Sequence, residues 1–422
     1  MEVAEAIENF SLRGIAVPAF GPTVLYGTAI GAILPVIALT ARDLGATVAL
    51  AALIITLTGI GSLLTNVPAT LITTRFGEKW ALVAAAGWCA LAMVLAATVQ
   101  VLWVFALAVF MVGMAGAVFG LARQTYVTEA VPLHFRARAL STLGGSNRIG
   151  VFIGPFAAAA AMHFAGTPGA YWVGAAAALG AGLLSLTVPE LTVHPRRPGR
   201  RSREQPQEEV VAEAPTIGQI LSGHSRTFRT VGIGVLLIAA VRSTRQAVIP
   251  LWAQHLGIDP AQTAIIYGIS AGVDMLIFYP AGRVMDLRGR RAVAVPCMLF
   301  MAAGLALLPL ASNPLELLLA ALLIGFGNGI GSGIVMTLGA DFSPSPGRPQ
   351  FLGLWRLLSD IGILSGPGIL SGVTALFSLA AGIGATAVLG LAGAAVLWRY
   401  VPKGRPSAGA GGAAASGRPP AG

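Results

Sequence analysis

Charged residues are scarce in this chain of 422 residues: they make up only 10% of it, whereas 55% of the residues are hydrophobic. A soluble globular domain carries about 25% charged residues, so this composition cannot cover the surface of soluble domains. Lysine is rarer still, because Lys79 and Lys403 are the only two among 27 basic residues. The composition excludes an ordinary soluble protein and indicates one that lies within a membrane.

Cysteine is also scarce. Cys89 and Cys297 each lie in an apolar run, and the chain has no Cys-x-x-Cys pair, which argues against a disulfide framework or a zinc site. Also absent are His-Glu-x-x-His, Gly-x-Ser-x-Gly, a Walker motif and a strand-linked Gly-x-Gly-x-x-Gly. We therefore expect no metal, no cofactor and no enzymatic activity, and transport driven by ATP is disfavoured.

Long apolar runs are what the sequence does contain. A helix needs about 20 apolar residues to cross a hydrocarbon core roughly 30 Å thick. Twelve stretches meet this requirement, which predicts an all-α integral membrane protein. They cover residues 15–40, 48–73, 80–99, 101–127, 140–163, 168–189, 230–254, 261–281, 292–311, 313–340, 350–374 and 377–399.

Two polar segments divide the chain. We expect an N-terminal bundle over 1–190, a charged linker over 191–229, a C-terminal bundle over 230–402 and a disordered tail over 403–422. Within the linker, Ile217, Ile220 and Leu221 are spaced for one face of a short surface helix.

The basic residues collect in alternate loops, and only Arg42 lies in the opposite set. Because basic loops stay in the cytoplasm, both termini are expected there. This clustering accounts for the formal charge of +10 without nucleic-acid binding, and the arginine-rich, alanine-rich composition favours a bacterial plasma membrane.

The two halves repeat at a single offset of 212 residues. Leu44-Gly45 aligns with Leu256-Gly257, Arg136 aligns with Arg348, and Arg148 aligns with Asp360. Six predicted spans separate the copies, so both halves have the same topology. Parallel repeats of this kind are one known design of transporters.

Two motifs recur in both halves. The loop over 282–291 reads GRVMDLRGRR, and its first-half copy is degraded, with Thr70 and Thr74 in place of Gly and Asp. The second motif is Gly-x-x-x-Gly-Pro. The motif residues are Arg75, Gly77, Lys79, Gly282, Asp286, Gly289, Arg290 and Arg291 for the loop, and Gly150, Gly154, Pro155, Gly362, Gly366 and Pro367 for the second motif.

With these motifs the chain resembles the major facilitator superfamily, and Gly-x-x-x-Gly-Pro resembles its drug/proton antiporter branch. The resemblance implies a monomer of two six-helix bundles that moves a small molecule by alternating access, with export coupled to protons as the leading expectation. A proton symporter or facilitative importer is the alternative, and a non-transporting receptor is a third. The resemblance also implies that Asp286 pairs with Arg138 beside the fifth helix. The glycine motif serves either helix packing or antiport.

Ionisable residues at membrane depth are expensive, at about 2.5–3.5 kcal/mol or more each, and are functional candidates by default. The candidates for proton coupling or substrate binding are Asp360, Asp274, Arg148, Arg123, Arg242, Arg245 and Arg356.

Several pairings remain open for these candidates. Arg148 pairs either with Asp360, its repeat partner, or with Asp274 across the two halves. Asp360 is expected near the midplane and Asp274 nearer the cytoplasm. Arg356 lies one turn before Asp360, as an ion pair would require. Asn328, in a run of glycines, is expected to serve helix packing.

Overall fold

The computed structural model describes residues 16–131, 135–189, 216–344 and 346–403. Over these ranges the chain is helical and contains no strand, and a π-helical segment (Phe228–Gly232) joins α9 to α10. The helices are α2 (Ala16–Ile33), α3 (Ile37–Asp43), α4 (Val48–Thr98), α5 (Leu102–Ala130), α6 (Arg136–Ala165), α7 (Pro168–Ser185), α8 (Ile217–Gly223), α9 (Ser225–Thr227), α10 (Ile233–His255), α11 (Pro260–Arg288), α12 (Arg291–Leu307), α13 (Pro314–Ile330), α14 (Ile334–Phe342), α15 (Arg348–Leu376) and α16 (Leu379–Tyr400).

Helix α4 contains two membrane crossings. Its 51 residues would extend about 77 Å as one helix, far more than a hydrocarbon core of about 30 Å. The helix bends at Gly77, whose φ of 78° and ψ of 165° are not helical. The gap left between the predicted spans 48–73 and 80–99 is therefore helical on both sides of Gly77, because one glycine in a conformation that other residues resist is enough to reverse the chain.

The predicted all-α membrane fold is confirmed. Ten stretches of the described chain are long and apolar enough to cross a membrane, α4 counts as two of the crossings, and the 18-residue α7 completes twelve. Two predicted helices are interrupted. The first divides into α2 and α3 around Pro35, and the tenth divides into α13 and α14 before Gly333, whose φ is 80°.

The same local devices occur in both halves. Thr47 caps α4, because its side chain accepts a hydrogen bond from the amide of Leu50, and Asp259 caps α11 in the same way 212 residues later. Gly45 and Gly257, also 212 apart, both have positive φ. N-caps and left-handed glycines are the usual start and stop signals of helices, so the sequence repeat is a structural repeat.

The Gly-x-x-x-Gly-Pro motif packs helices within each half. A Cβ atom on Gly150 or Gly154 would collide with the backbone of α2, and one on Gly362 or Gly366 would collide with the backbone of α10. Small residues allow this close approach of helix backbones in membranes. The motif has the same packing role in α6 and in α15.

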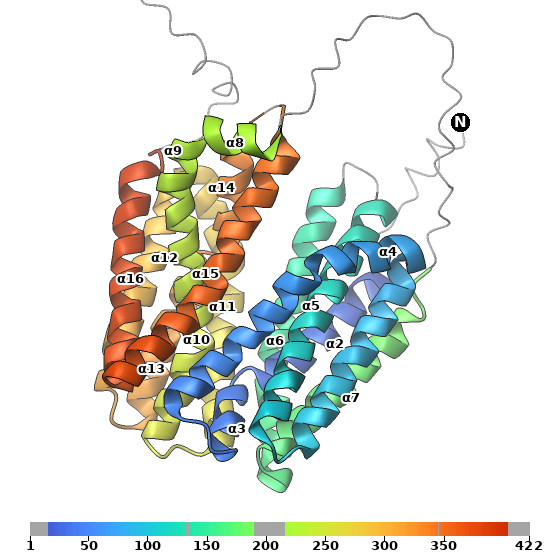
Figure 1. Ribbon diagram of the computed structural model, residues 1–422, viewed down its shortest axis with the longest axis vertical. Helices are drawn as coiled ribbons and strands as arrows, with labels where there is room; N and C mark the ends of the chain where they lie inside the picture. Colours follow the sequence, from blue (N-terminus) through green and yellow to red (C-terminus); the bar gives the residue numbers. More distant parts are fainter. Residues whose placement is uncertain (1–15, 132–134, 190–215, 345, 404–422) are drawn as a thin grey trace, which may run out of the picture.

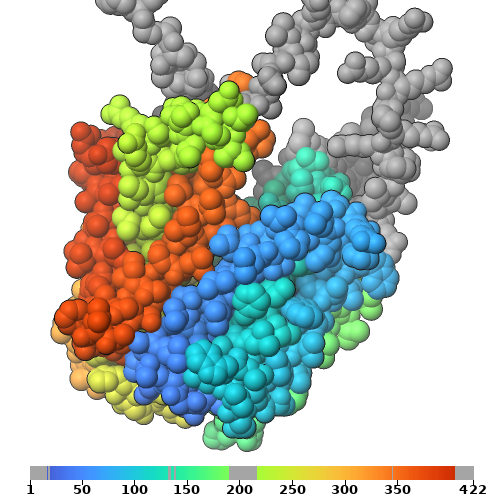
Figure 2. All heavy atoms as spheres, viewed as in Figure 1, coloured from blue at the N-terminus to red at the C-terminus, as the bar shows by residue number. Residues whose placement is uncertain are grey.

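The two bundles lie side by side and meet along two seams. Helix α6 packs on α11, and the first part of α4 packs on α15; Figure 2 shows the blue surface of α4 against the orange surface of α15. The bundles approach each other most closely at the end that holds α3 and diverge toward α8 (Figure 1). At the α3 end, Arg42 Nε donates to Gln254 Oε1 at 3.3 Å. These residues are 212 apart, so the contact lies on the pseudo-twofold axis.

Candidate functional site

A cavity of about 500 Å³ lies between the two bundles. Most of its wall comes from α10, α11, α13, α14 and α15, and three residues of the other half complete it: Leu34, Arg148 and Val151. Its volume is within the range of about 300–1,000 Å³ that small-molecule sites occupy. The wall contains four charged side chains among mostly apolar ones, which makes this the candidate site.

Asp274 is the centre of the charged cluster. It lies on α11, midway between Pro260 and Arg288, or roughly 21 Å along the helix from either end. Helix α11 continues for two further turns beyond the predicted end, and a position of Asp274 nearer the cytoplasm stays a prediction. Its side chain is only 11% exposed, so it requires charged or polar partners.

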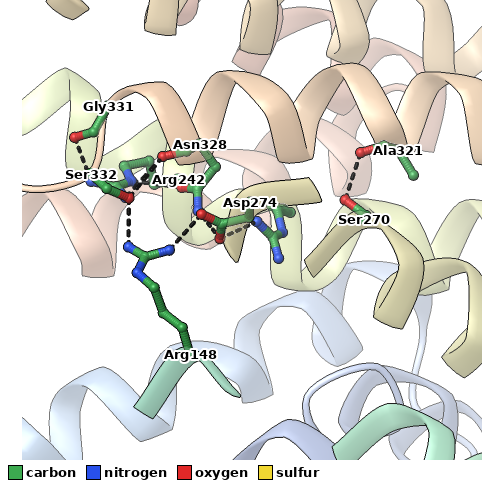
Figure 3. A network of polar contacts seen from close by, with 9 residues as sticks. Arg148, Arg242, Ser270, Asp274, Ala321, Asn328, Gly331 and Ser332 are labelled. Carbon is green, nitrogen blue, oxygen red and sulfur yellow. Dashed lines mark hydrogen bonds and ion pairs between the residues drawn. The ribbon is translucent and has the colours of Figure 1, made fainter. Parts of the chain in front are cut away.

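Two arginines pair with this carboxylate from different helices. Arg148 on α6 approaches Asp274 Oδ1 at 2.5 Å, and Arg245 on α10 approaches Oδ2 at 3.3 Å. The sequence left either Asp360 or Asp274 as the partner of Arg148, and in the structure the partner is Asp274. Figure 3 shows Arg148 reaching from α6 toward α11 and α13. The pair therefore links the N-terminal bundle to the C-terminal bundle at membrane depth.

Asn328 connects the carboxylate to a third arginine. Its amide nitrogen donates to Asp274 Oδ2 at 2.6 Å, and its amide oxygen accepts from Arg242 Nε at 2.7 Å. The glycines beside it do pack, since a Cβ on Gly329 would meet the backbone of Asp274. The assignment of Asn328 itself to packing was wrong. Asn328 is the one amide side chain in the apolar helix α13, and this feature could have identified it as a polar site residue.

Ser332 is a further residue that sequence reasoning missed. Its hydroxyl accepts a hydrogen bond from the Arg148 guanidinium at 2.5 Å and donates to the carbonyl of Asn328 at 3.3 Å. It lies in the turn between α13 and α14, and this break in the helix points the hydroxyl at Arg148. Serine is common in small-residue helix contacts, so the type of residue alone carried no signal.

Asp360 is not part of the cluster. It is half-buried on α15 and is absent from the cavity wall, whereas the preceding residue, Ser359, lines the cavity. The expected ion pair with Arg356 does not form: Arg356 is exposed, and no contact within 4 Å joins these two described residues. Asp360 is thus a carboxylate without a direct ion pair, on the helix that packs against α4.

Arg123 is half-buried on α5, and its guanidinium donates to Asn147 Oδ1 at 3.0 Å. Asn147 is the neighbour of Arg148 on α6, yet Arg123 does not line the cavity that contains the cluster. The structure therefore places Arg123 within the N-terminal bundle, separate from Arg242 and Arg245.

The loop motif lies at the α8 end of the molecule. Gly289 has a φ of 88°, like its repeat partner Gly77, whereas Gly282 is helical with open space around it. Arg75 lies over Phe76, Lys79 over Trp80 and Arg291 over Trp398.

Asp286 was expected to pair with Arg138. Asp286 is exposed and lies 3.5 Å from Arg290, four residues later, beyond the end of α11, and the side chain of Arg138 is outside the described residues. Arg290 also binds Asp341 at 2.8 Å. The acidic partners of this arginine both belong to the C-terminal bundle, so it joins α11 to α14.

Among the described residues, no group of three or more His, Cys, Asp or Glu side chains is arranged to bind a metal. The side chains that line the site are three arginines, one carboxylate and several hydrogen-bonding groups among apolar residues.

The family model described as Major Facilitator Superfamily matches residues 20–240 and 230–421. A search of curated protein sequences gave no significant match.

Several solved structures share the fold. A D-xylose-proton symporter superimposes with a TM-score of 0.67 at 17% identity, over 93% of this chain and 98% of that one. A bacterial homologue of the human lysosomal transporter Spinster, inward-facing and unoccupied, gives 0.72 at 12% identity, over 92% and 96%. The nucleoside transporter NupG gives 0.67 at 15% identity, over 90% and 98%.

Proposed function

The chain belongs to the Major Facilitator Superfamily, and on this premise we propose that it carries a small molecule across the membrane by alternating access through the cavity between its bundles. Membership of the superfamily indicates a transporter rather than an enzyme. Direction, substrate and coupling ion are the proposed parts.

The observation that carries the proposal is the ion pair between Arg148 and Asp274. Its two members lie on different bundles, at membrane depth and in the cavity wall. Four charged side chains at this depth cost about 10 kcal/mol together on insertion scales before they pair. A pair that joins the bundles makes and breaks as they rock, so it contributes differently to the two states that alternation requires.

We place the α8 end in the cytoplasm. The arginine-rich loop motifs lie at that end, and basic loops remain cytoplasmic. Because the bundles meet at the α3 end and diverge toward α8 (Figure 1), the structure would then be open inward. A bacterial plasma membrane, cytoplasmic termini and a monomeric state complete this assignment.

Protons are the proposed coupling ion, and Asp274 is the proposed carboxylate. Protonation would remove the negative charge that holds Arg148 to the opposite bundle, which ties proton binding to rearrangement of the seam. Export by proton antiport is a second candidate, favoured by the intact Gly-x-x-x-Gly-Pro motif. Because the motif packs helices in both bundles, it is weaker evidence for antiport than the sequence alone suggested.

Flux measurements on proteoliposomes with clamped membrane potential test the proposal. Sugars, amino acids, lipophilic drugs and organic anions would be added singly, and uptake and external pH recorded. Alkalinisation on substrate addition indicates symport, whereas acidification indicates antiport. Asp274→Asn should abolish the pH change, and Asp360→Asn should keep it. Uptake without a pH change would refute proton coupling, and no protein-dependent uptake of any compound would contradict transport of these classes.

A further inference from the structure

The charges that line the cavity do not balance. Arg148, Arg242 and Arg245 face a single carboxylate, Asp274. The residues of the cavity wall therefore carry a formal surplus of two positive charges at membrane depth. A network that served packing alone would be expected to approach neutrality, because an uncompensated buried charge is strongly destabilising.

Arg242 is the arginine with the least compensation. Its guanidinium donates to the side-chain and main-chain oxygens of Asn328 and to the carbonyl of Gly331. All three acceptors are neutral, and none of the ion pairs found in the described chain includes Arg242. Its guanidinium is hydrogen-bonded but forms no direct ion pair, and in this sense its charge is unmatched.

Arg245 has spare donor capacity. Its side chain is only 7% exposed, yet its Nε has no hydrogen-bond partner. An unpaired buried donor is unfavourable by about 1–3 kcal/mol. The nearby ring of Tyr267, at 5.2 Å from the guanidinium carbon, attracts the cation through its face, but Nε donates no hydrogen bond.

We propose that the cavity binds a small organic oxyanion, a carboxylate or a phosphate ester, whose charge is held among Arg148, Arg242 and Arg245, the three arginines that share one carboxylate. This inference rests on the proposed function, for which it names the substrate class. Arginine forks bind both groups through paired hydrogen bonds. Arg148 reaches in from the other bundle (Figure 3), so a bound anion would join the two bundles as Asp274 does.

The apolar part of the cavity wall indicates the chemistry of the part of the substrate that carries no charge. Leu34, Val151, Val335, Met336 and Ile363 give the cavity apolar sides. An anion with a compact apolar body, such as an aromatic or branched aliphatic acid, satisfies both parts of the wall. Inorganic anions would leave the apolar part unfilled.

The sign of the substrate also bears on coupling. The charged groups that face Asp274 are Arg148 from α6 and Arg242 and Arg245 from α10, with Asn328 from α13. A substrate anion competes with ionised Asp274 for these cations, whereas protonated Asp274 frees them. Anion and proton therefore favour each other's binding, and this effect is reciprocal. The anion and the proton therefore bind to the same conformation of the transporter. This favours symport, in which both move in the same direction.

Three nearly isosteric probes test the charge of the ligand directly. Benzoate, benzamide and benzylamine carry charges of −1, 0 and +1 on one aromatic body, and phenyl phosphate adds the phosphate arm. Melting temperature would be measured on purified protein in detergent at millimolar ligand. We expect a rise of about 2 °C or more with benzoate or phenyl phosphate, as mass action requires, and none with benzamide or benzylamine. The arm that responds identifies the oxyanion.

Arg242→Gln should abolish the response, and the exposed control Arg356→Gln should keep it. With benzoate, whose charge hardly changes in this range, lowering the pH from 7.5 to 5.5 should tighten binding, because bound anion and proton favour each other, and Asp274→Asn should remove this dependence. Equal or greater stabilisation by benzamide or benzylamine, or no response to either anion, overturns the proposal.

A second measurement needs no ligand. Because Arg242 carries unmatched charge, Arg242→Gln should melt at or above the wild-type temperature, whereas Arg245→Gln, which loses a partner of Asp274, should melt below it. A fall in Arg242→Gln as large as that in Arg245→Gln would show a structural role and overturn the proposal. Anion binding without flux would instead count against the transport function, so the two failures are distinguishable.

Discussion

Asp274→Asn is the substitution whose effect on stability follows most directly from the structure. Asparagine has nearly the same shape, so the change removes charge without creating a cavity. Both arginines that pair with Asp274 then lose their counter-charge. Removing one member of a buried ion pair is unfavourable by about 3–5 kcal/mol. Since Arg148 is 23% exposed and water screens part of its charge, we expect the lower end, about 3 kcal/mol.

The assay is thermal melting of the purified protein in detergent, with Asp360→Asn as the matched control. Asp360 is also a carboxylate at membrane depth in the C-terminal bundle, but it forms no ion pair among the described residues. We expect Asp274→Asn to lower the melting temperature by about 5 °C or more and the control to change it by less than about 2 °C. Adding Arg148→Gln to Asp274→Asn should restore part of the loss. Equal melting of the two single variants would refute this account of the cluster.

Three further predictions concern the frame around the site. Gly154→Val should sharply reduce folded protein, by about 3 kcal/mol or more through overpacking against α2, whereas Gly144→Val, with open space on the same helix, should express normally; similar yields of the two would contradict the packing role of the motif. Gly289→Ala should destabilise the protein by about 1–3 kcal/mol because of its positive φ, and melting at the wild-type temperature would exclude strain there. Linking cysteines introduced at Arg42 and Gln254 with a short bifunctional thiol reagent should stop uptake reversibly by holding the α3 end closed, and full uptake after cross-linking would argue against alternating access.

The sequence by itself determined the architecture. An unbroken apolar run long enough to cross a bilayer forms a helix, because lipid offers no hydrogen bonds to the backbone and a helix satisfies them within the segment. The 212-residue offset predicted two like bundles, and the structure reproduces it in detail: Thr47 and Asp259 cap equivalent helices, and Arg42 meets Gln254 across the axis. These features depend on local composition and spacing, which one chain displays in full.

Only the tertiary structure decided which polar residues share a cavity. Successive residues on a helix point about 100° apart, so Ser359 lines the cavity while Asp360 does not. The sequence left Arg148 two possible partners and assigned Asn328 to packing. The sequence of one helix shows neither how that helix is rotated nor that α6 contacts α11. Packing of small residues set those rotations, and with them the surplus of positive charge from which the substrate class is inferred.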